Sequence, residues 1–158
     1  MDTLPFFEWL DTSILADISK AYGGTFAIVQ VFHLLSMVVL GGMILTSDLR
    51  LLGVVMRDVP VDTVLDNTQP WINRSLVVII LTGIFMSSAV AIKLNYNEFF
   101  WAKMASLAFG IFFLYAIKRP LLRGDLSELN AWTPKVLAIA SLTVWFTVAA
   151  SGRWIGFS

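Results

Sequence analysis

Residues 27–45, AIVQVFHLLSMVVLGGMIL, decide the fold of this chain. They contain no Asp, Glu, Lys or Arg, and the uncharged run around them extends from residue 21 to residue 47. A helix that crosses a bilayer needs about 20 mostly apolar residues. The stretch therefore predicts a transmembrane helix, and that helix carries His33, the only histidine in the chain.

Three further uncharged runs follow, at residues 75–92, 104–117 and 136–152. The chain is 58% hydrophobic and 14% charged, whereas about a quarter of the residues in a soluble domain are charged. We expect four transmembrane helices, at roughly 24–47, 71–93, 99–117 and 134–155. Short connections make neighbouring helices antiparallel. The predicted fold is an all-α integral membrane protein, an antiparallel four-helix bundle that forms one domain of residues 1–158 in the lipid bilayer.

The N-terminal segment, residues 1–23, is amphipathic rather than uniformly apolar. Phe7, Leu10, Ile14, Ile18 and Tyr22 recur at helical spacing. Asp11 would fall on this apolar stripe in one continuous helix, so we expect a break where Asp11, Thr12 or Ser13 caps a second short helix. The segment is predicted to lie at the membrane surface.

The distribution of Lys and Arg predicts the orientation, because basic residues concentrate on the cytoplasmic side. The connections after the first and third helices hold Arg50, Arg57, Arg74, Lys118, Arg119, Arg123 and Lys135. The opposite side holds only Lys20, Lys93, Lys103 and Arg153. We therefore expect a bacterial inner-membrane protein with both termini in the periplasm. The net charge of zero argues against a nucleic-acid partner.

The connection between the first two helices is punctuated by Pro60 and Pro70. We expect the first helix to continue to Met56 or Arg57, residues 62–68 to form a helical turn or two, and the second helix to begin near Trp71. Asp48 and Arg50 would lie near Asn73 and Arg74. These four would either form an ion-pair and hydrogen-bond cluster or, as we expect, simply anchor the helix ends.

His33 lies about 14 Å into its helix, at 1.5 Å per residue from Gly24. Polar groups at such depth are costly and face the bundle interior. Neutral imidazole is a good ligand for iron or copper. Gln30 and Met37 share the stripe of His33, and Gly41 with Gly42 would either open space for a flat cofactor or allow close helix packing. The alternative is that His33 hydrogen-bonds across a helix pair as a structural contact.

Lys103 lies about one turn into the third helix, on the same outer half as His33. Either it reaches the membrane surface with its long side chain, or it meets an anionic group such as a heme propionate. Arg153, near the outer end of the fourth helix, would share that task. A copper site built from His33 and Met37 is the competing interpretation, because copper accepts imidazole and thioether ligands.

Four stretches carry a family resemblance: FHLLSMVVLGGMIL, LTGIFM, WAKMASLAFGIFFLY and SGRWIGF. They resemble a family of uncharacterised bacterial four-helix inner-membrane proteins. More distantly, the first-helix His and the W-x-K of the third helix are similar to HemJ-type protoporphyrinogen oxidases and CopD-type copper-resistance proteins. The HemJ resemblance implies that His33 ligates heme and that Lys103 is functionally important. This chain has no second histidine, so it departs from that pattern.

These observations lead to a first hypothesis of a membrane protein that binds heme b and handles electrons, alone or as a small subunit of a membrane complex. His33 would ligate iron, Lys103 and Arg153 would hold the propionates, and Gln30 would orient the imidazole. The alternatives are copper handling and a non-catalytic structural or assembly subunit. Catalytic residues and enzymatic activity stay open. The expected partners are a membrane redox protein or further copies of the chain.

Overall fold

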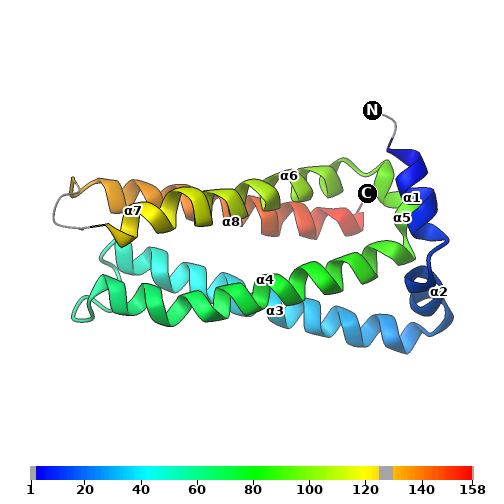
Figure 1. Ribbon diagram of the computed structural model, residues 1–158, viewed down its shortest axis with the longest axis horizontal. Helices are drawn as coiled ribbons and strands as arrows, with labels where there is room; N and C mark the ends of the chain where they lie inside the picture. Colours follow the sequence, from blue (N-terminus) through cyan, green and yellow to red (C-terminus); the bar gives the residue numbers. More distant parts are fainter. Residues whose placement is uncertain (1–2, 125–129, 158) are drawn as a thin grey trace.

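The computed structural model describes residues 3–124 and 130–157. Figure 1 shows long antiparallel helices with both chain ends at the same end of the bundle. They are α3 (Gly23–Leu51), α4 (Val61–Ala89), α6 (Glu98–Phe112) with its continuation, and α8 (Thr133–Trp154). Helix α6 continues through the π-helix η1 (Phe113–Lys118) into α7 (Arg119–Arg123). All four of these long segments are apolar enough to cross a membrane. The chain is a multi-pass, all-α membrane protein, as predicted.

The bundle is made of two helical hairpins. Helix α3 packs along α4, and α6 packs along α8. The hairpins meet mainly through α3 and α8, whereas α4 and α6 make at most slight contact. The backbones of α4 and α6 are therefore further apart, and side chains of α6 such as Leu107 and Ile111 pack against the core between the hairpins. The central core is formed by Leu40, Ile44, Ile72, Leu76, Ile79, Leu114, Trp145 and Val148.

Short helices cover the end of the bundle that carries the termini: α1 (Leu4–Asp11), α2 (Ile14–Ala21) and α5 (Ala91–Asn95) (Figure 1). A final 3-10 turn, η2, spans Ile155–Phe157. The predicted break after Asp11 is confirmed, and the Ser13 hydroxyl accepts a hydrogen bond from the Ala16 amide as the N-cap of α2. Phe7 and Leu10 of α1 pack with Ala91 and Leu94 of α5. This packing fixes α1 across the bundle end.

The expected extension of the first helix is wrong, because α3 ends at Leu51. Gly53 has a φ of +73° and Met56 a φ of +50°, both in the left-handed region. Such residues cannot continue a right-handed helix. Leu52, Val54 and Val55 are apolar, so this stretch resembled a continuation of the helix. Gly53 was the residue that indicated the turn.

The expected start of the second helix at Trp71 is also wrong, because α4 begins at Val61 and passes through Pro70. Proline removes one backbone hydrogen bond within a helix. The carbonyl that loses its partner is that of Asp66, an exposed residue, where water can replace the donor. Helix α4 ends at Ala89, Val90 forms a turn, and residues 91–93 of the predicted helix belong to α5. Helix α8 begins and ends within one residue of the prediction.

Candidate functional site

His33 is buried inside the bundle, with 7% of its surface exposed. Its Nδ1 atom lies 2.8 Å from Oγ1 of Thr82 on α4. Gly83 is next to the ring, since a Cβ placed there would lie 3.6 Å from Cε1 of His33. The α3–α4 hairpin thus holds the imidazole against a hydroxyl on one edge and a glycine on another.

The hydrogen bonds of Thr82 assign the tautomer of His33. The Thr82 hydroxyl donates to its own helix, 2.6 Å from the Val78 carbonyl. A hydroxyl has one proton, so Oγ1 acts as an acceptor toward the ring. Nδ1 of His33 then carries the proton, and Nε2 keeps its lone pair. A histidine fixed in this way is prepared to bind a metal through Nε2.

Lys103 approaches this site from the other hairpin. Its side chain is half-buried and packs over Gly152 of α8, where a Cβ would lie 3.5 Å from Nζ. The ammonium is close enough to His33 to interact electrostatically. It makes no hydrogen bond or ion pair to another side chain in residues 3–124 and 130–157. His33 and Lys103 are therefore brought to one region, and the cation there has no protein counter-ion among the described residues.

The other residues selected from the sequence lie elsewhere. Gln30 is exposed on α3, one turn before His33. Arg153 is exposed and its guanidinium lies 4.3 Å from the centre of the Phe157 ring. Met37 is half-buried and packs against the central core. Among the described residues no group of three or more His, Cys, Asp or Glu side chains could hold a metal ion. The structure thus brings together His33 and Lys103, with Thr82 in the orienting position assigned to Gln30.

Gly41 and Gly42 do not mediate close helix packing. A Cβ at either position would meet nothing within 4 Å. Gly41 lines an apolar groove of about 600 Å³ between α3 and α8, together with Ile44, Leu45, Leu142, Thr143, Trp145 and Phe146. His33 does not line this groove. The space that these glycines open is therefore separate from the imidazole.

A second polar centre lies nearer the other end of the bundle. Lys118 of η1 forms an ion pair with Oδ1 of Asp48 on α3, and its Nζ atom is 3.4 Å from Oγ of Ser141 on α8. These three residues are 2%, 0% and 0% exposed. Oδ2 of Asp48 is buried and has no hydrogen-bond partner in the part of the chain that the structure describes. The Asp48–Lys118 ion pair joins the two hairpins.

The alternative of an ion-pair cluster that joins Asp48 to Arg50, Asn73 and Arg74 is wrong, because Asp48 pairs with Lys118. Arg50 instead donates to the Val59 carbonyl at 2.8 Å, and the Arg74 guanidinium lies 5.6 Å from the centre of the Trp71 ring. Lys118 was counted as a loop cation because it follows an apolar run. It is buried because η1 places it inside the bundle, and a π-helical turn has no clear signature in a single sequence.

The fold and the two polar centres define a multi-pass membrane protein with intramembrane polar groups at two levels. The chain belongs to a family of unknown function, DUF6644, whose family model matches residues 6–158. This finding confirms membership of an uncharacterised family. No curated protein and no solved structure matched the chain.

Proposed function

We propose that this protein binds heme b through His33 and takes part in electron transfer in the bacterial inner membrane. The observation that carries the proposal is the bond between His33 and Thr82. It occupies Nδ1 and leaves Nε2 unprotonated inside the bundle, which is the form of imidazole that ligates iron. Burial shields the ring from competing water.

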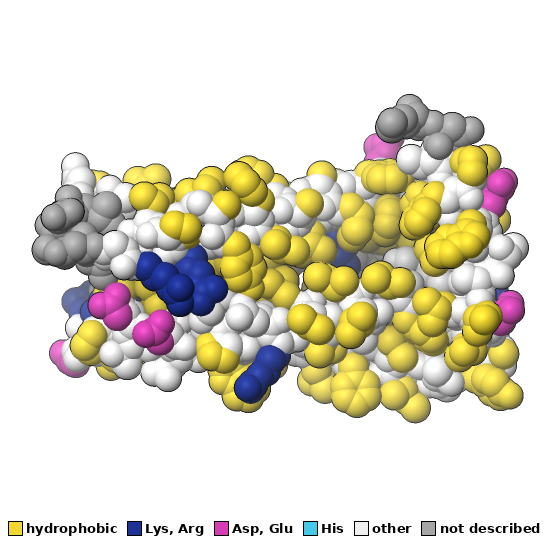
Figure 2. Space-filling model, in the orientation of Figure 1, with side chains coloured by type: hydrophobic (Ala, Val, Ile, Leu, Met, Phe, Trp, Pro, Cys, Tyr) yellow, Lys and Arg dark blue, Asp and Glu magenta, His cyan; other side chains and the backbone are white. Residues whose placement is uncertain are grey.

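The wider separation of the α4 and α6 backbones supports a flat ligand at this level. Figure 2 shows a recess between the two hairpins, in the half nearer the short helices, with a basic side chain at its floor. Lys103 is half-buried on the α6 side of the bundle, where its ammonium would pair with a propionate. Gly83 leaves the edge of the His33 ring uncovered by a side chain. Arg153 lies at the surface and would meet the second propionate only if its side chain turned inward.

The second axial position sets a limit on the kind of heme site. Because the chain has one histidine, bis-histidine ligation within one copy is excluded. The iron would be five-coordinate, would take a non-histidine ligand, or would lie between two copies that each supply His33. In the third case the partner would be a second copy of the chain. In the other two cases the expected partner is a membrane redox protein.

The localisation that accompanies this proposal has both termini in the periplasm. Its support is the excess of Lys and Arg at the end of the bundle opposite the termini. The His33 and Lys103 level would then lie toward the periplasmic side, where a propionate reaches the membrane surface.

The test is the absorption spectrum of detergent-purified protein, as isolated and after addition of hemin, oxidised and dithionite-reduced. We expect a Soret band that is lost in His33→Gly and restored when free imidazole fills the space of the missing ring. Restoration distinguishes ligation from a folding defect. Lys103→Met should weaken heme retention, whereas Lys93→Met, an exposed lysine on α5, should not. Folded protein that takes up no hemin would overturn the proposal and leave the His33–Thr82 bond as a structural contact between helices.

A further inference from the structure

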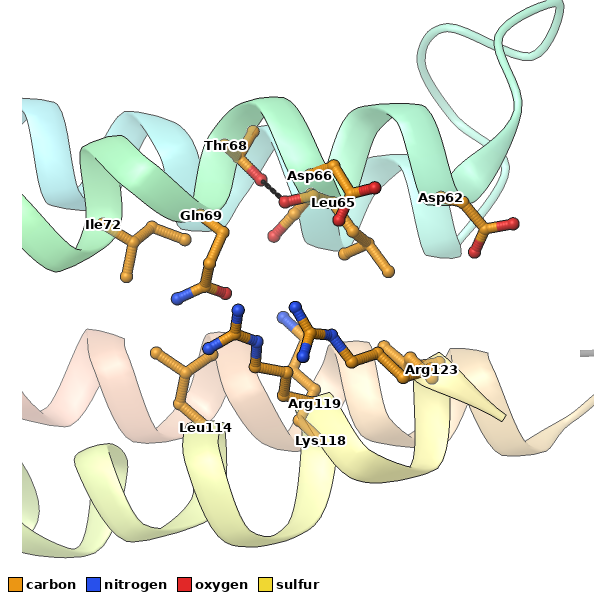
Figure 3. A pocket seen from close by; sticks show the side chains of 12 residues that line it. Asp62, Leu65, Asp66, Thr68, Gln69, Ile72, Leu114, Lys118, Arg119 and Arg123 are labelled. Atoms are coloured by element: carbon orange, nitrogen blue, oxygen red, sulfur yellow. Dashed lines mark hydrogen bonds between the residues drawn. The ribbon is translucent and has the colours of Figure 1, made fainter. Parts of the chain in front are cut away.

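A polar cavity opens between α4 and α7 at the end of the bundle opposite the termini. Its volume is about 330 Å³. Figure 3 shows Arg119 and Arg123 reaching from α7 toward α4, with Gln69 and Asp66 on the facing helix. Asp62 lies one turn before Asp66 on the same helix. Ser47 and Lys118 form part of the wall. The cavity is therefore bordered by charges of both signs from two separate elements.

These charges face one another without pairing. No ion pair within 4 Å joins Arg119 or Arg123 to Asp62 or Asp66, all of them described residues. The guanidinium of Arg119 lies 6.0 Å from the centre of the Tyr115 ring. Two cations four residues apart on a helix repel each other. A ligand that carries both a negative and a positive group would stabilise this arrangement, because it would give the arginines and the aspartates the opposite charges that they lack.

The balance of charge selects the kind of ligand. Lys118 is already neutralised by Asp48, which leaves the cavity with two guanidinium groups and two carboxylates that form no ion pair within residues 3–124 and 130–157. A simple anion would be attracted by the arginines and repelled by the aspartates. A simple cation would be attracted by the aspartates and repelled by the arginines. A zwitterion satisfies both sides. Guanidinium favours phosphate because it donates two parallel hydrogen bonds, and carboxylates accept hydrogen bonds from a primary ammonium.

We propose that this cavity binds a ligand in which a phosphate is joined to a primary amine, with the phosphate between Arg119 and Arg123 and the amine at Asp62 and Asp66. Two sources share this chemistry: the headgroup of phosphatidylethanolamine and a soluble phosphoethanolamine. The site lies near one end of the transmembrane bundle, at the level where headgroups are found. It is independent of the heme proposal, since it shares no residue with the His33 region.

The first experiment uses the full-length protein in nanodiscs of equal phosphatidylethanolamine and phosphatidylglycerol, with native mass spectrometry of the lipids retained after release. We expect preferential retention of phosphatidylethanolamine. Arg119→Gln should reduce it roughly tenfold, the effect of losing one charge-assisted pair. Asp66→Asn should shift the preference toward phosphatidylglycerol, because it removes repulsion of the anionic lipid and a partner of the amine.

Matched controls are available at the same end of the bundle. Arg74→Gln and Asp58→Asn remove exposed charges that do not line the cavity, and both should leave retention unchanged. A merely electrostatic effect of net charge would move these variants equally, and that result would overturn the proposal. If the wild-type protein and Asp66→Asn each retained phosphatidylethanolamine and phosphatidylglycerol equally, the lipid would be ruled out as the ligand.

The second arm tests the soluble source with O-phosphoethanolamine added to delipidated protein in detergent. An increase in Tm that is absent in Arg119→Gln and absent with inorganic phosphate would support binding of a soluble zwitterion. Retention of phosphatidylethanolamine without such an increase would assign the site to the lipid. If neither ligand distinguishes wild-type protein from Arg119→Gln, the proposal is wrong.

Discussion

The Lys118 ammonium donates a hydrogen bond to Oδ1 of Asp48, a residue 70 positions earlier in the chain, and both side chains are removed from solvent. Desolvation of two charges is costly, and a buried pair repays that cost only when its remaining hydrogen-bonding groups are satisfied. Here Oδ2 of Asp48 is left without a partner among the described residues. The pair therefore connects α3 to η1 with directional contact but at a considerable cost in solvation.

Removing one partner of this pair should destabilise the protein. Asp48→Asn leaves a buried ammonium without a counter-charge, and we expect a loss of about 3–5 kcal/mol in the free energy of unfolding. The measurement is unfolding in mixed micelles of increasing denaturing detergent, followed by circular dichroism. Asp58→Asn, which removes an exposed acid, is the control.

Replacing both partners by apolar residues should have the opposite result. The double variant Asp48→Leu with Lys118→Met removes both desolvation costs and the unsatisfied oxygen together. We expect stability within about 1 kcal/mol of the wild type, or higher. A double variant as unstable as Asp48→Asn alone would show that the pair contributes net stability and not only specificity of packing.

Two glycines give opposite predictions for the same substitution. A Cβ at Gly110 would lie 3.2 Å from Cγ1 of Val144 and 3.5 Å from the Trp145 ring, whereas one at Gly41 meets nothing within 4 Å. Gly110→Ala should therefore lower stability by about 1–3 kcal/mol through overpacking. Gly41→Ala should raise stability by about 0.5–1 kcal/mol through helix propensity. Comparison of the two Tm values in one detergent checks both signs.

The Thr82 hydroxyl should matter for a bound heme more than for the fold. Thr82→Val preserves shape and removes the acceptor for Nδ1 of His33. Loss of such a supporting partner lowers metal affinity by about 10–100-fold. Hemin titration measures it. Thr143→Val is the control, because the Thr143 hydroxyl bonds only to the carbonyl of Ile139 on its own helix. Equal hemin affinity in both variants would contradict the orienting role.

The sequence predicted the number and order of the transmembrane helices because the bilayer imposes a length and an apolar composition on each of them. It also predicted the break after Asp11, with Ser13 as one of three candidate caps, because capping depends on local chemistry alone. It misplaced the start of α4, since a proline that usually ends a helix is tolerated at Pro70 where water can replace its missing hydrogen bond. The position of a helix end depends on whether water or protein satisfies the backbone groups there. Amino-acid composition does not indicate this.

The candidate site was only partly accessible from the sequence. His33 and Lys103 could be selected because polar residues are rare in apolar runs, and the structure places them in one region. Their supporting residues could not be selected, because Thr82 and Gly152 are ordinary in composition and gain meaning only through contact. The Asp48–Lys118 pair joins distant helices, and pairing across 70 residues has no signal in a single chain.

The π-helical segment Phe113–Lys118 gives this protein one place where chain length can change without turning the rest of the helix. A π turn holds one residue more than an α turn. Deleting a single residue there and restoring α geometry would leave Arg119 and Arg123 of α7 on the same face relative to α6. A one-residue deletion within α6 itself would instead turn everything beyond it by about 100°. Among relatives of this chain, the place of a one-residue gap would therefore decide whether Arg119 and Arg123 still point toward α4.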